Sequence, residues 1–314
     1  MADTLMDMVE AGVATEAMTS KALRAIIVEE EPLLEYISWE RLPQGTPAYR
    51  YFRERRLPTT SFRSVNGSID ADRGIIIPRQ ENLAILGGQV KIDPFILDTM
   101  GGQLTQGIKA RQFEMMMRSA KQKWLETFFE GDSGVDPNAF EGLRTRAIGT
   151  GMNFDMSTGT DRAALTLEKL DEVIEAVKGG PTVIALNQWL RRKVNALMRA
   201  AGQAREEVST SFGKILPMYA GSKMIVIQRE DDMSSILDFD EDPGDGGDDT
   251  ASIYAIKFAD DAVKGILGYG GAWEVRDMGE MQTANAVLGR LAVYVGMATE
   301  HPRSFARLHS VGQI

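Results

Sequence analysis

The sequence has 314 residues, enough for one large domain or two modest ones, with ordinary fractions of hydrophobic (43%) and charged (25%) residues. The absence of cysteine excludes disulfide bonds, thiolate catalysis and cysteine-bound metals. No run approaches the ~18 apolar residues of a membrane span. The acidic first residues do not match a secretory signal, so we expect synthesis in the cytoplasm and no membrane partner.

The net charge of −10 is divided into blocks of opposite sign. Residues 1–40 hold nine acids and two bases, residues 41–80 hold eight arginines and three acids, and residues 230–249 hold ten acids and no base. Such blocks indicate segments that meet segments of opposite charge, including those of neighbouring copies of the chain.

The N-terminal segment is predicted to form an arm. Residues 1–19 are rich in Ala and Met, weakly patterned, and expected to become ordered only in an assembly. A short helix is expected over residues 21–30, with Pro32 ending it.

Residues 43–78 are predicted to form an extended hairpin. Tyr49 and Tyr51 alternate with other residues as in a two-faced ribbon, and Asn66-Gly67 favours a hairpin turn. The segment could be a solvated surface hairpin. Because an isolated hairpin is marginal in water, the alternative is a long excursion that lies on another subunit.

The most regular pattern covers residues 103–130, which are rich in helix-favouring residues. The apolar residues on one face are Phe113, Met117, Ala120, Trp124 and Phe128. Gly131 ends the run. A helix of about 28 residues is roughly 42 Å long, close to the ~50 Å diameter of a compact globule of this size. The sequence therefore predicts a helix that lies along a thin body.

Helices and strands alternate from about residue 150 to 270, which predicts a compact α/β subdomain. Thr166 and Asn187 are suited to cap its two helices, and the polar residues 205–214 are expected to form a loop. The strands predicted in this region and after it cover residues 182–186, 223–228, 252–258, 273–276 and 288–297, and residues 304–311 close the chain.

Candidate sites for catalysis and phosphate binding are weak. His301 and His309 are the only histidines, and no Gly-x-Ser-x-Gly elbow is present. The glycine-rich residues 265–271 lack the ending of a P-loop, so tight turns between strands are the expected reason for them.

Metal and nucleic-acid sites are weak as well. Residues 238–244 alternate carboxylates as a calcium loop does, but Pro243 replaces the required glycine, and we expect a solvated acidic loop. The arginines of residues 50–63 are better suited to ion pairs with a neighbour than to specific nucleic-acid binding. The sequence thus predicts no catalytic, cofactor-binding or metal residues. An α/β enzyme is the disfavoured alternative.

Two short motifs then point to a family. The run 128–133 (Phe-Phe-Glu-Gly-Asp-Ser) ends the long helix, and a turn at 140–143 (Phe-Glu-Gly-Leu) follows. These motifs, and the order of the parts, resemble the major capsid proteins of tailed bacteriophages.

The resemblance implies an α+β fold in four parts. Residues 1–42 would be the N-terminal arm and residues 43–80 the extended β-hairpin loop. Residues 81–150 and 271–314 would form the peripheral domain, with the spine helix at about 103–130. Residues 151–270 would form the axial α/β domain.

The resemblance also implies a structural protein without cofactors that self-assembles into an icosahedral shell of hexamers and pentamers. The shell would be part of the virion, made in the host cytoplasm and enclosing double-stranded DNA through non-specific contacts. Expected helpers are a separate scaffolding protein, a portal and a cement protein. The alternative is an encapsulin-like bacterial compartment that encloses protein cargo.

One departure from the family pattern carries a prediction. Some family members join their subunits covalently through a lysine on the extended loop. This chain has no lysine between Lys21 and Lys91, so we expect a non-covalent shell.

Overall fold

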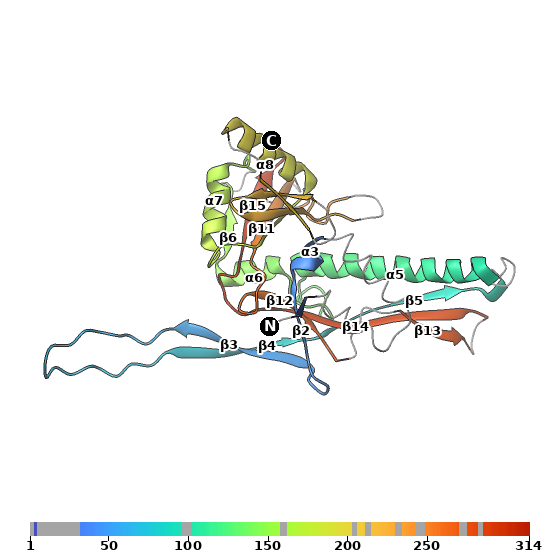
Figure 1. Ribbon diagram of the computed structural model, residues 1–314, viewed down its shortest axis with the longest axis horizontal. Helices are drawn as coiled ribbons and strands as arrows, with labels where there is room; N and C mark the ends of the chain where they lie inside the picture. The colour runs from blue at the N-terminus through green and yellow to red at the C-terminus, as the bar shows by residue number, and fades with distance from the viewer. Residues whose placement is uncertain are drawn as a thin grey trace.

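The computed structural model describes residues 3–4, 32–95, 102–157, 162–202, 206–210, 215–229, 234–242, 249–269, 275–281 and 285–314, except for the side chains of 3–4 and 102–108. Helix α5 (Gly102–Glu130) runs through the molecule, with one sheet along its length and a second, helix-covered sheet at its C-terminal end. A two-stranded hairpin projects on the side away from the N-terminal half of α5 (Figure 1). The predicted mixed α+β architecture is confirmed.

Helix α5 matches the helix predicted over residues 103–130 within one residue. Its buried side includes Met117, Trp124 and Phe128, which face the core at the predicted spacing. After it ends, the backbone N–H of Gly142 donates to the carbonyl of Gly131 at 2.7 Å. A Cβ on Gly142 would lie 2.5 Å from the Gly131 nitrogen, so both glycines of the two motifs are needed for this close approach.

The sheet along α5 is built on the long strand β14 (Val287–Thr299). β14 pairs antiparallel with β5 (Ala84–Ile92), β13 (Val275–Glu280) and β12 (Val263–Leu267). β12 in turn pairs with β2 (Ser38–Arg41), and β2 with β1 (Asp3–Thr4). Alternate residues of β5 are partly buried, and α5 packs against this strand.

The second sheet contains seven strands in the order β6-β15-β11-β7-β10-β9-β8. Their bounds are Asn153–Asp155 (β6), Phe305–Gly312 (β15), Thr250–Ile256 (β11), Val183–Leu186 (β7), Ser222–Val226 (β10), Ile215–Tyr219 (β9) and Glu206–Ser209 (β8).

Each face of this sheet buries a core. Helices α7 (Leu167–Ala176) and α8 (Gln188–Ala200) cover one face through Leu170, Leu190 and Val194. The other face packs on the end of α5 and on α6 (Leu143–Thr150). The predicted caps are confirmed, because Thr166 and Asn187 accept from the backbone N–H groups of Lys169 and Leu190.

The hairpin consists of β3 (Ala48–Arg56) and β4 (Ile75–Asn82), paired antiparallel, with residues 57–74 forming an unpaired tip. The predicted turn is present: Asn66 has φ 66°, and the backbone N–H of Gly67 donates to the carbonyl of Ser64 at 3.0 Å.

The strand pairing divides the chain differently from the sequence-based boundaries. β12 was assigned to the segment 151–270 but lies in the sheet of β14, and β15 was assigned to 271–314 but lies beside β11. The chain crosses between the two sheets three times, after Ile92, after Ile256 and after Thr299. These crossings depend on long-range pairing that no local pattern reveals.

The N-terminal part of the chain also differs from expectation. The predicted arm over residues 1–42 includes α3 (Pro32–Tyr36) and β2, and in this part Leu33, Ile37 and Trp39 are fully buried. This part therefore belongs to the body of its own subunit. Of residues 1–31 the structure describes only 3–4, which pair with β2. The rest of this segment, including the short helix expected at 21–30, lies outside the described residues.

The prediction of a loop at residues 205–214 is wrong in part, because residues 206–209 form β8 and pair with β9. β8 is an edge strand with mostly exposed polar side chains, which is why its sequence does not alternate.

Candidate assembly surfaces

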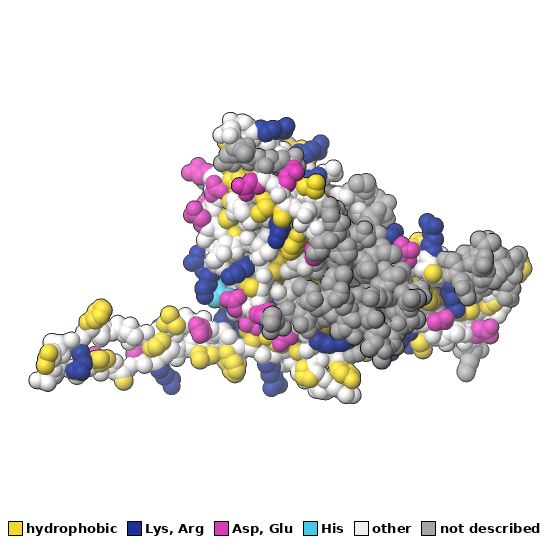
Figure 2. Space-filling view, in the orientation of Figure 1, with side chains coloured by type: hydrophobic (Ala, Val, Ile, Leu, Met, Phe, Trp, Pro, Cys, Tyr) yellow, Lys and Arg dark blue, Asp and Glu magenta, His cyan; other side chains and the backbone are white. Residues whose placement is uncertain are grey.

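The hairpin exposes large apolar side chains that its own subunit leaves uncovered. These residues are Phe52, Leu57, Phe62, Val65, Ile69, Ile75 and Ile76, each at least 44% exposed. They lie along the whole projection, where Figure 2 shows hydrophobic side chains in yellow. Large apolar side chains gathered in one place on a surface are typical of sites that bind another protein. These exposed residues therefore favour a hairpin that lies on another subunit over a solvated surface hairpin.

A second set of exposed apolar residues lies on the elements along α5. These residues are Ile85, Phe95, Met115, Met278 and Tyr294. Ile85 and Tyr294 are opposite each other in the β5–β14 ladder, so they share one face of the sheet. The molecule thus carries apolar surface both on its projection and on its body.

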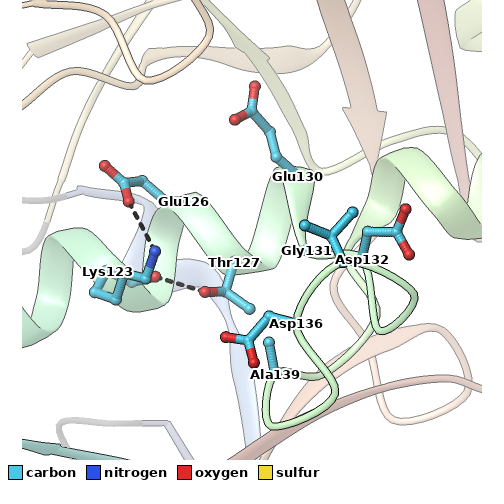
Figure 3. A pocket seen from close by; sticks show the side chains of 9 residues that line it. Lys123, Glu126, Thr127, Glu130, Gly131, Asp132, Asp136 and Ala139 are labelled. Carbon is cyan, nitrogen blue, oxygen red and sulfur yellow. Dashed lines mark hydrogen bonds and ion pairs between the residues drawn. The ribbon is translucent and has the colours of Figure 1, made fainter.

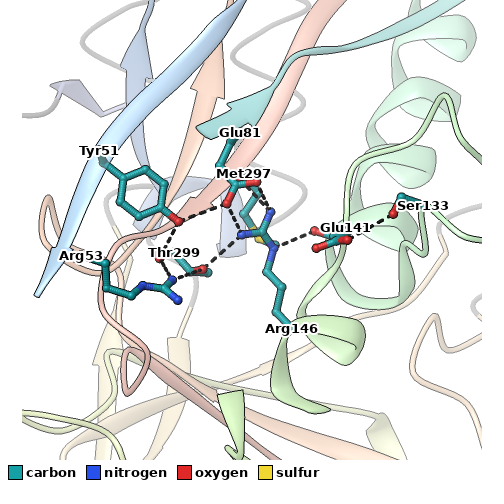
Figure 4. A network of polar contacts seen from close by, with 8 residues as sticks. All are labelled: Tyr51, Arg53, Glu81, Ser133, Glu141, Arg146, Met297 and Thr299. Atoms are coloured by element: carbon teal, nitrogen blue, oxygen red, sulfur yellow. Dashed lines mark hydrogen bonds and ion pairs between the residues drawn. The ribbon is translucent and has the colours of Figure 1, made fainter. Parts of the chain in front are cut away.

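The root of the hairpin is held by a polar cluster, here called the root network (Tyr51, Arg53, Glu81, Arg146 and Thr299; Figure 4). Arg146 on α6 forms a bidentate ion pair with Glu81 on β4, with both N–O distances 2.7 Å. The Tyr51 hydroxyl lies 3.1 Å from Glu81 Oε1 and from the carbonyl oxygen of Thr299. Arg53 donates to the carbonyl of Glu300 at 3.1 Å and also to that of Thr299.

A lysine extends this attachment. Lys264 on β12 contacts the carboxylates of Glu40 and Glu300 at 2.5 and 2.6 Å and lies over the ring of Tyr49. Burial works against its charge, but hydrogen bonds to Glu300 and Glu40 raise the pKa of Lys264. The Tyr49 hydroxyl donates to Glu300 at 2.7 Å, so the hairpin, β2, β12 and the end of β14 meet in one charged cluster.

The last turns of α5 and the loop after it enclose a shallow acidic hollow (Figure 3). Its lining residues are Lys123, Glu126, Thr127, Glu130, Gly131, Asp132, Val135, Asp136 and Ala139. Burial, and the nearby carboxylates of Asp240 and Glu241, raise the pKa of Glu130 to about 7.

The acidic segment 230–249 is not simply a solvated loop, as the sequence suggested. Glu241 is buried and pairs with Arg307 at 2.8 Å, while the Ser252 hydroxyl donates to it at 2.5 Å. Ile236 and Leu237 are also buried. Residues 230–233 and 243–248 lie outside the described residues. Among the side chains described, no group of three acids or histidines is placed to hold a metal ion.

The two histidines occupy structural positions. His301 accepts from the backbone N–H of Arg303 at 3.0 Å, and His309 lies 2.8 Å from the Ser310 hydroxyl. Burial lowers the pKa of both imidazoles; Lys178 adds to this for His301, as Arg307 does for His309. The His309 Nδ1 that contacts Ser310 also lies 3.9 Å from the Asp155 carboxylate. In a catalytic triad the nucleophile and the acid contact different ring nitrogens, so neither histidine has that geometry.

The glycines at 265–271 were expected to form tight turns, and this is wrong for Gly265. Gly265 lies inside β12, where a Cβ would come 2.6 Å from the ring of Trp39. Gly268 is similar, because a Cβ would lie 2.7 Å from the side chain of Tyr294. Close packing against neighbouring side chains explains these two residues.

Some arginines of residues 50–63 make contacts within their own subunit. Arg53 binds the body, Arg50 donates to Gln80 at 3.2 Å, and Arg56 pairs with Asp72 across the hairpin. Ion pairing of this block with acidic segments of a neighbour stays a prediction. Sequence reasoning missed Arg146 and Glu81, since no local pattern links two residues so far apart.

Comparisons with known proteins give a consistent result. No family model and no curated protein matches the chain. Among solved structures, it is similar to the SrpI encapsulin of Synechococcus elongatus, with TM-score 0.62, 18% identity, and 97% of this chain and 95% of that chain covered.

Structures of a phage and of a particle capsid match as well. A structure of Microbacterium phage Oxtober96 has TM-score 0.59 and 13% identity, covering 86% of this chain and 88% of that one. The capsid of a native GTA particle has TM-score 0.53 and 10% identity, covering 89% and 90%. With the long helix, the projecting hairpin and the two sheets described above, this chain has the fold shared by tailed-phage major capsid proteins and encapsulin shell proteins.

Proposed function

We propose that this chain is the structural subunit of a closed icosahedral shell built from many copies of itself. The observation that carries the proposal is the hairpin, which projects away from the body. Its apolar side chains have no cover within the described part of their own subunit. A second copy is the simplest source of that cover, because the body also carries exposed apolar surface along α5. Hexamers and pentamers of one chain supply such neighbours at every position.

The parts of the chain take the following proposed roles. Residues before Pro32 form the arm, and residues 43–80 form the loop that lies on a neighbour. The sheet of β14 together with α5 forms the peripheral domain. The seven-stranded sheet together with α7 and α8 forms the axial domain. This division follows the observed strand pairing rather than the sequence-based boundaries.

The energetics suit a shell held without covalent bonds. An interface of 2,000–5,000 Å² gives on the order of 50–125 kcal/mol of gross apolar transfer, most of which association entropy and polar desolvation cancel. A small surplus at each contact, repeated over a closed lattice, is enough for a durable container.

For the contents we propose double-stranded DNA, held by non-specific contacts in a phage capsid whose assembly uses a separate scaffolding protein, a portal and a cement protein. A protein-filled compartment is the second candidate. It is favoured by the greater coverage and higher TM-score of the encapsulin match relative to the phage and GTA capsids above.

Electron microscopy of the purified protein, alone and with its scaffolding partner, tests the shell. Closed particles support it, and a stable monomer in both samples contradicts it. Nuclease-protected DNA inside the particles identifies a capsid, whereas a co-purifying protein without DNA identifies a compartment. A ladder of linked chains on a denaturing gel of mature particles would refute the non-covalent assembly.

A further inference from the structure

The Arg146 guanidinium uses its full hydrogen-bonding capacity at the root of the hairpin. Besides its two bonds to Glu81, it donates to the Glu141 carbonyl at 3.0 Å, the Thr299 hydroxyl at 3.1 Å and the Met297 carbonyl at 3.2 Å. Arginine has five N–H donors, so each of them has an acceptor here. One side chain thereby ties α6, the loop after α5, β14 and the hairpin strand β4 together (Figure 4).

The apolar attachment of the hairpin is small by comparison. The local cluster contains four buried residues, Leu42, Tyr51, Ile266 and Ala298, with Tyr49 and Leu83 packed against it. Apolar contacts are non-directional, so a cluster of this size holds the hairpin to the body without fixing its angle. Directionality must come from the polar contacts.

The Arg146–Glu81 pair has the properties of such a directional element. Its side chains are 8% and 20% exposed, and its planar fork-to-fork geometry allows only a narrow range of orientations. Buried ion pairs contribute little net stability, since desolvation offsets the attraction, but can select one arrangement among several. A small rotation of β4 would break both parallel hydrogen bonds together.

We propose that Arg146 and Glu81 are positioning residues that fix the direction in which the hairpin leaves the body. The direction of the hairpin determines where a neighbouring subunit is met, so the pair also sets the curvature of the shell. The second statement rests on the proposed function, and the first does not.

Distance measurement within one chain tests the first statement. The chain has no cysteine, so the variant Ser68→Cys/Glu175→Cys carries spin labels only at the hairpin tip and on α7, both at exposed positions. Labelled protein is diluted in unlabelled protein, so that pulsed EPR reports the distance within one chain whether or not particles form. We expect one narrow distribution in the parent.

Two variants of the pair are then introduced into the labelled chain. Glu81→Gln keeps the shape of the side chain but removes its charge, and Arg146→Lys keeps the charge but removes the fork. We expect both to shift and broaden the distance distribution. Glu54→Gln is the matched control, because this substitution makes the same chemical change at an exposed position on the same hairpin. It should leave the distribution unchanged.

The outcomes test the positioning role of the pair and its effect on shell curvature separately. A distribution for Glu81→Gln that overlaps those of the parent and the Glu54→Gln control overturns the positioning role. If Arg146→Lys fails to fold, Glu81→Gln still decides. When the distribution changes, electron microscopy should show particles of altered or mixed diameter; parent-sized particles would refute the link to curvature. The absence of any particle from the parent contradicts the proposed function, and leaves the distance result standing.

Discussion

Gly265 of β12 lies directly beneath the indole of Trp39 on the paired strand β2, so close that a Cβ would come 2.6 Å from Trp39 Cε3. Trp39 also packs within the core against Trp124 of α5 in a tilted arrangement, with ring centroids 5.1 Å apart. The N-terminal strand, the sheet and the long helix are therefore packed around one indole ring, and space for it depends on the missing side chain.

The first prediction follows from this contact. Gly265→Ala should destabilise the folded chain by about 1–3 kcal/mol, because the added methyl group forces Trp39 off its position in a dense core. Urea denaturation measures the change, with variant and parent in the same assembly state. Gly149→Ala is the control: nothing lies within 4 Å of its Cβ position, and alanine should favour helix α6 by up to about 1 kcal/mol. Equal midpoints for Gly265→Ala and the parent would contradict the packing argument.

The second prediction concerns the buried pair Glu241–Arg307, whose side chains are 6% and 5% exposed. Arg307→Met leaves the Glu241 carboxylate buried without its main partner and should lower the free energy of unfolding by about 3–5 kcal/mol. The double variant Arg307→Met/Glu241→Met should lose less, because no uncompensated charge remains.

The exposed pair Lys169–Glu172 on α7, at 2.8 Å, is the comparison for that experiment. Lys169→Met should change the free energy of unfolding by no more than about 1 kcal/mol, because solvent screens this pair. Urea denaturation of all three variants shows whether their losses in the free energy of unfolding follow this order. A double variant less stable than Arg307→Met alone would show that the pair is net stabilising and that our account of it is wrong.

The third prediction concerns the hairpin tip. Phe62→Asn and Val65→Asn should each change the free energy of unfolding by no more than about 0.5 kcal/mol, because both side chains are solvent-exposed in the subunit. Both should reduce particle yield, because the proposed interface loses apolar area. Ser61→Asn, a polar replacement in the same tip, is the control. Normal particle yield from Phe62→Asn/Val65→Asn would exclude the tip from the interface.

How much of the fold the sequence could predict depends on how local the cause is. Helix α5 was predicted within one residue because its apolar period and the stop at Gly131 are local signals. The assignment of β12 and β15 to sheets could not be predicted, because pairing such as Val263↔Thr299 joins distant segments. The same applies to the candidate site: exposed apolar residues of the hairpin can be found in the sequence, whereas the meeting of Arg146 with Glu81 exists only in the fold.

The last prediction is a pH dependence that arises at Glu130. Burial and the neighbouring carboxylates of Asp240 and Glu241 outweigh the opposing charge of Arg144 and raise the pKa from its ordinary 4.5 to about 7. The folded chain therefore holds this proton more tightly than the unfolded chain does. Its contribution to stability is complete below pH 4.5 and is lost as the pH rises through about 7.

Glu130→Gln removes this dependence, because the amide stays neutral at every pH. The variant should gain stability relative to the parent as the pH rises between 4.5 and 7, with the gain levelling off above that window at on the order of 1–2 kcal/mol, since solvent screens a partly exposed carboxylate. Urea denaturation at a series of pH values measures the difference. Glu175→Gln, an exposed carboxylate on α7, should run parallel to the parent throughout. A Glu130→Gln curve that also stays parallel to the parent would mean that Glu130 is ionised in the folded chain at its ordinary pKa, and that the hollow at the end of α5 carries its full negative charge.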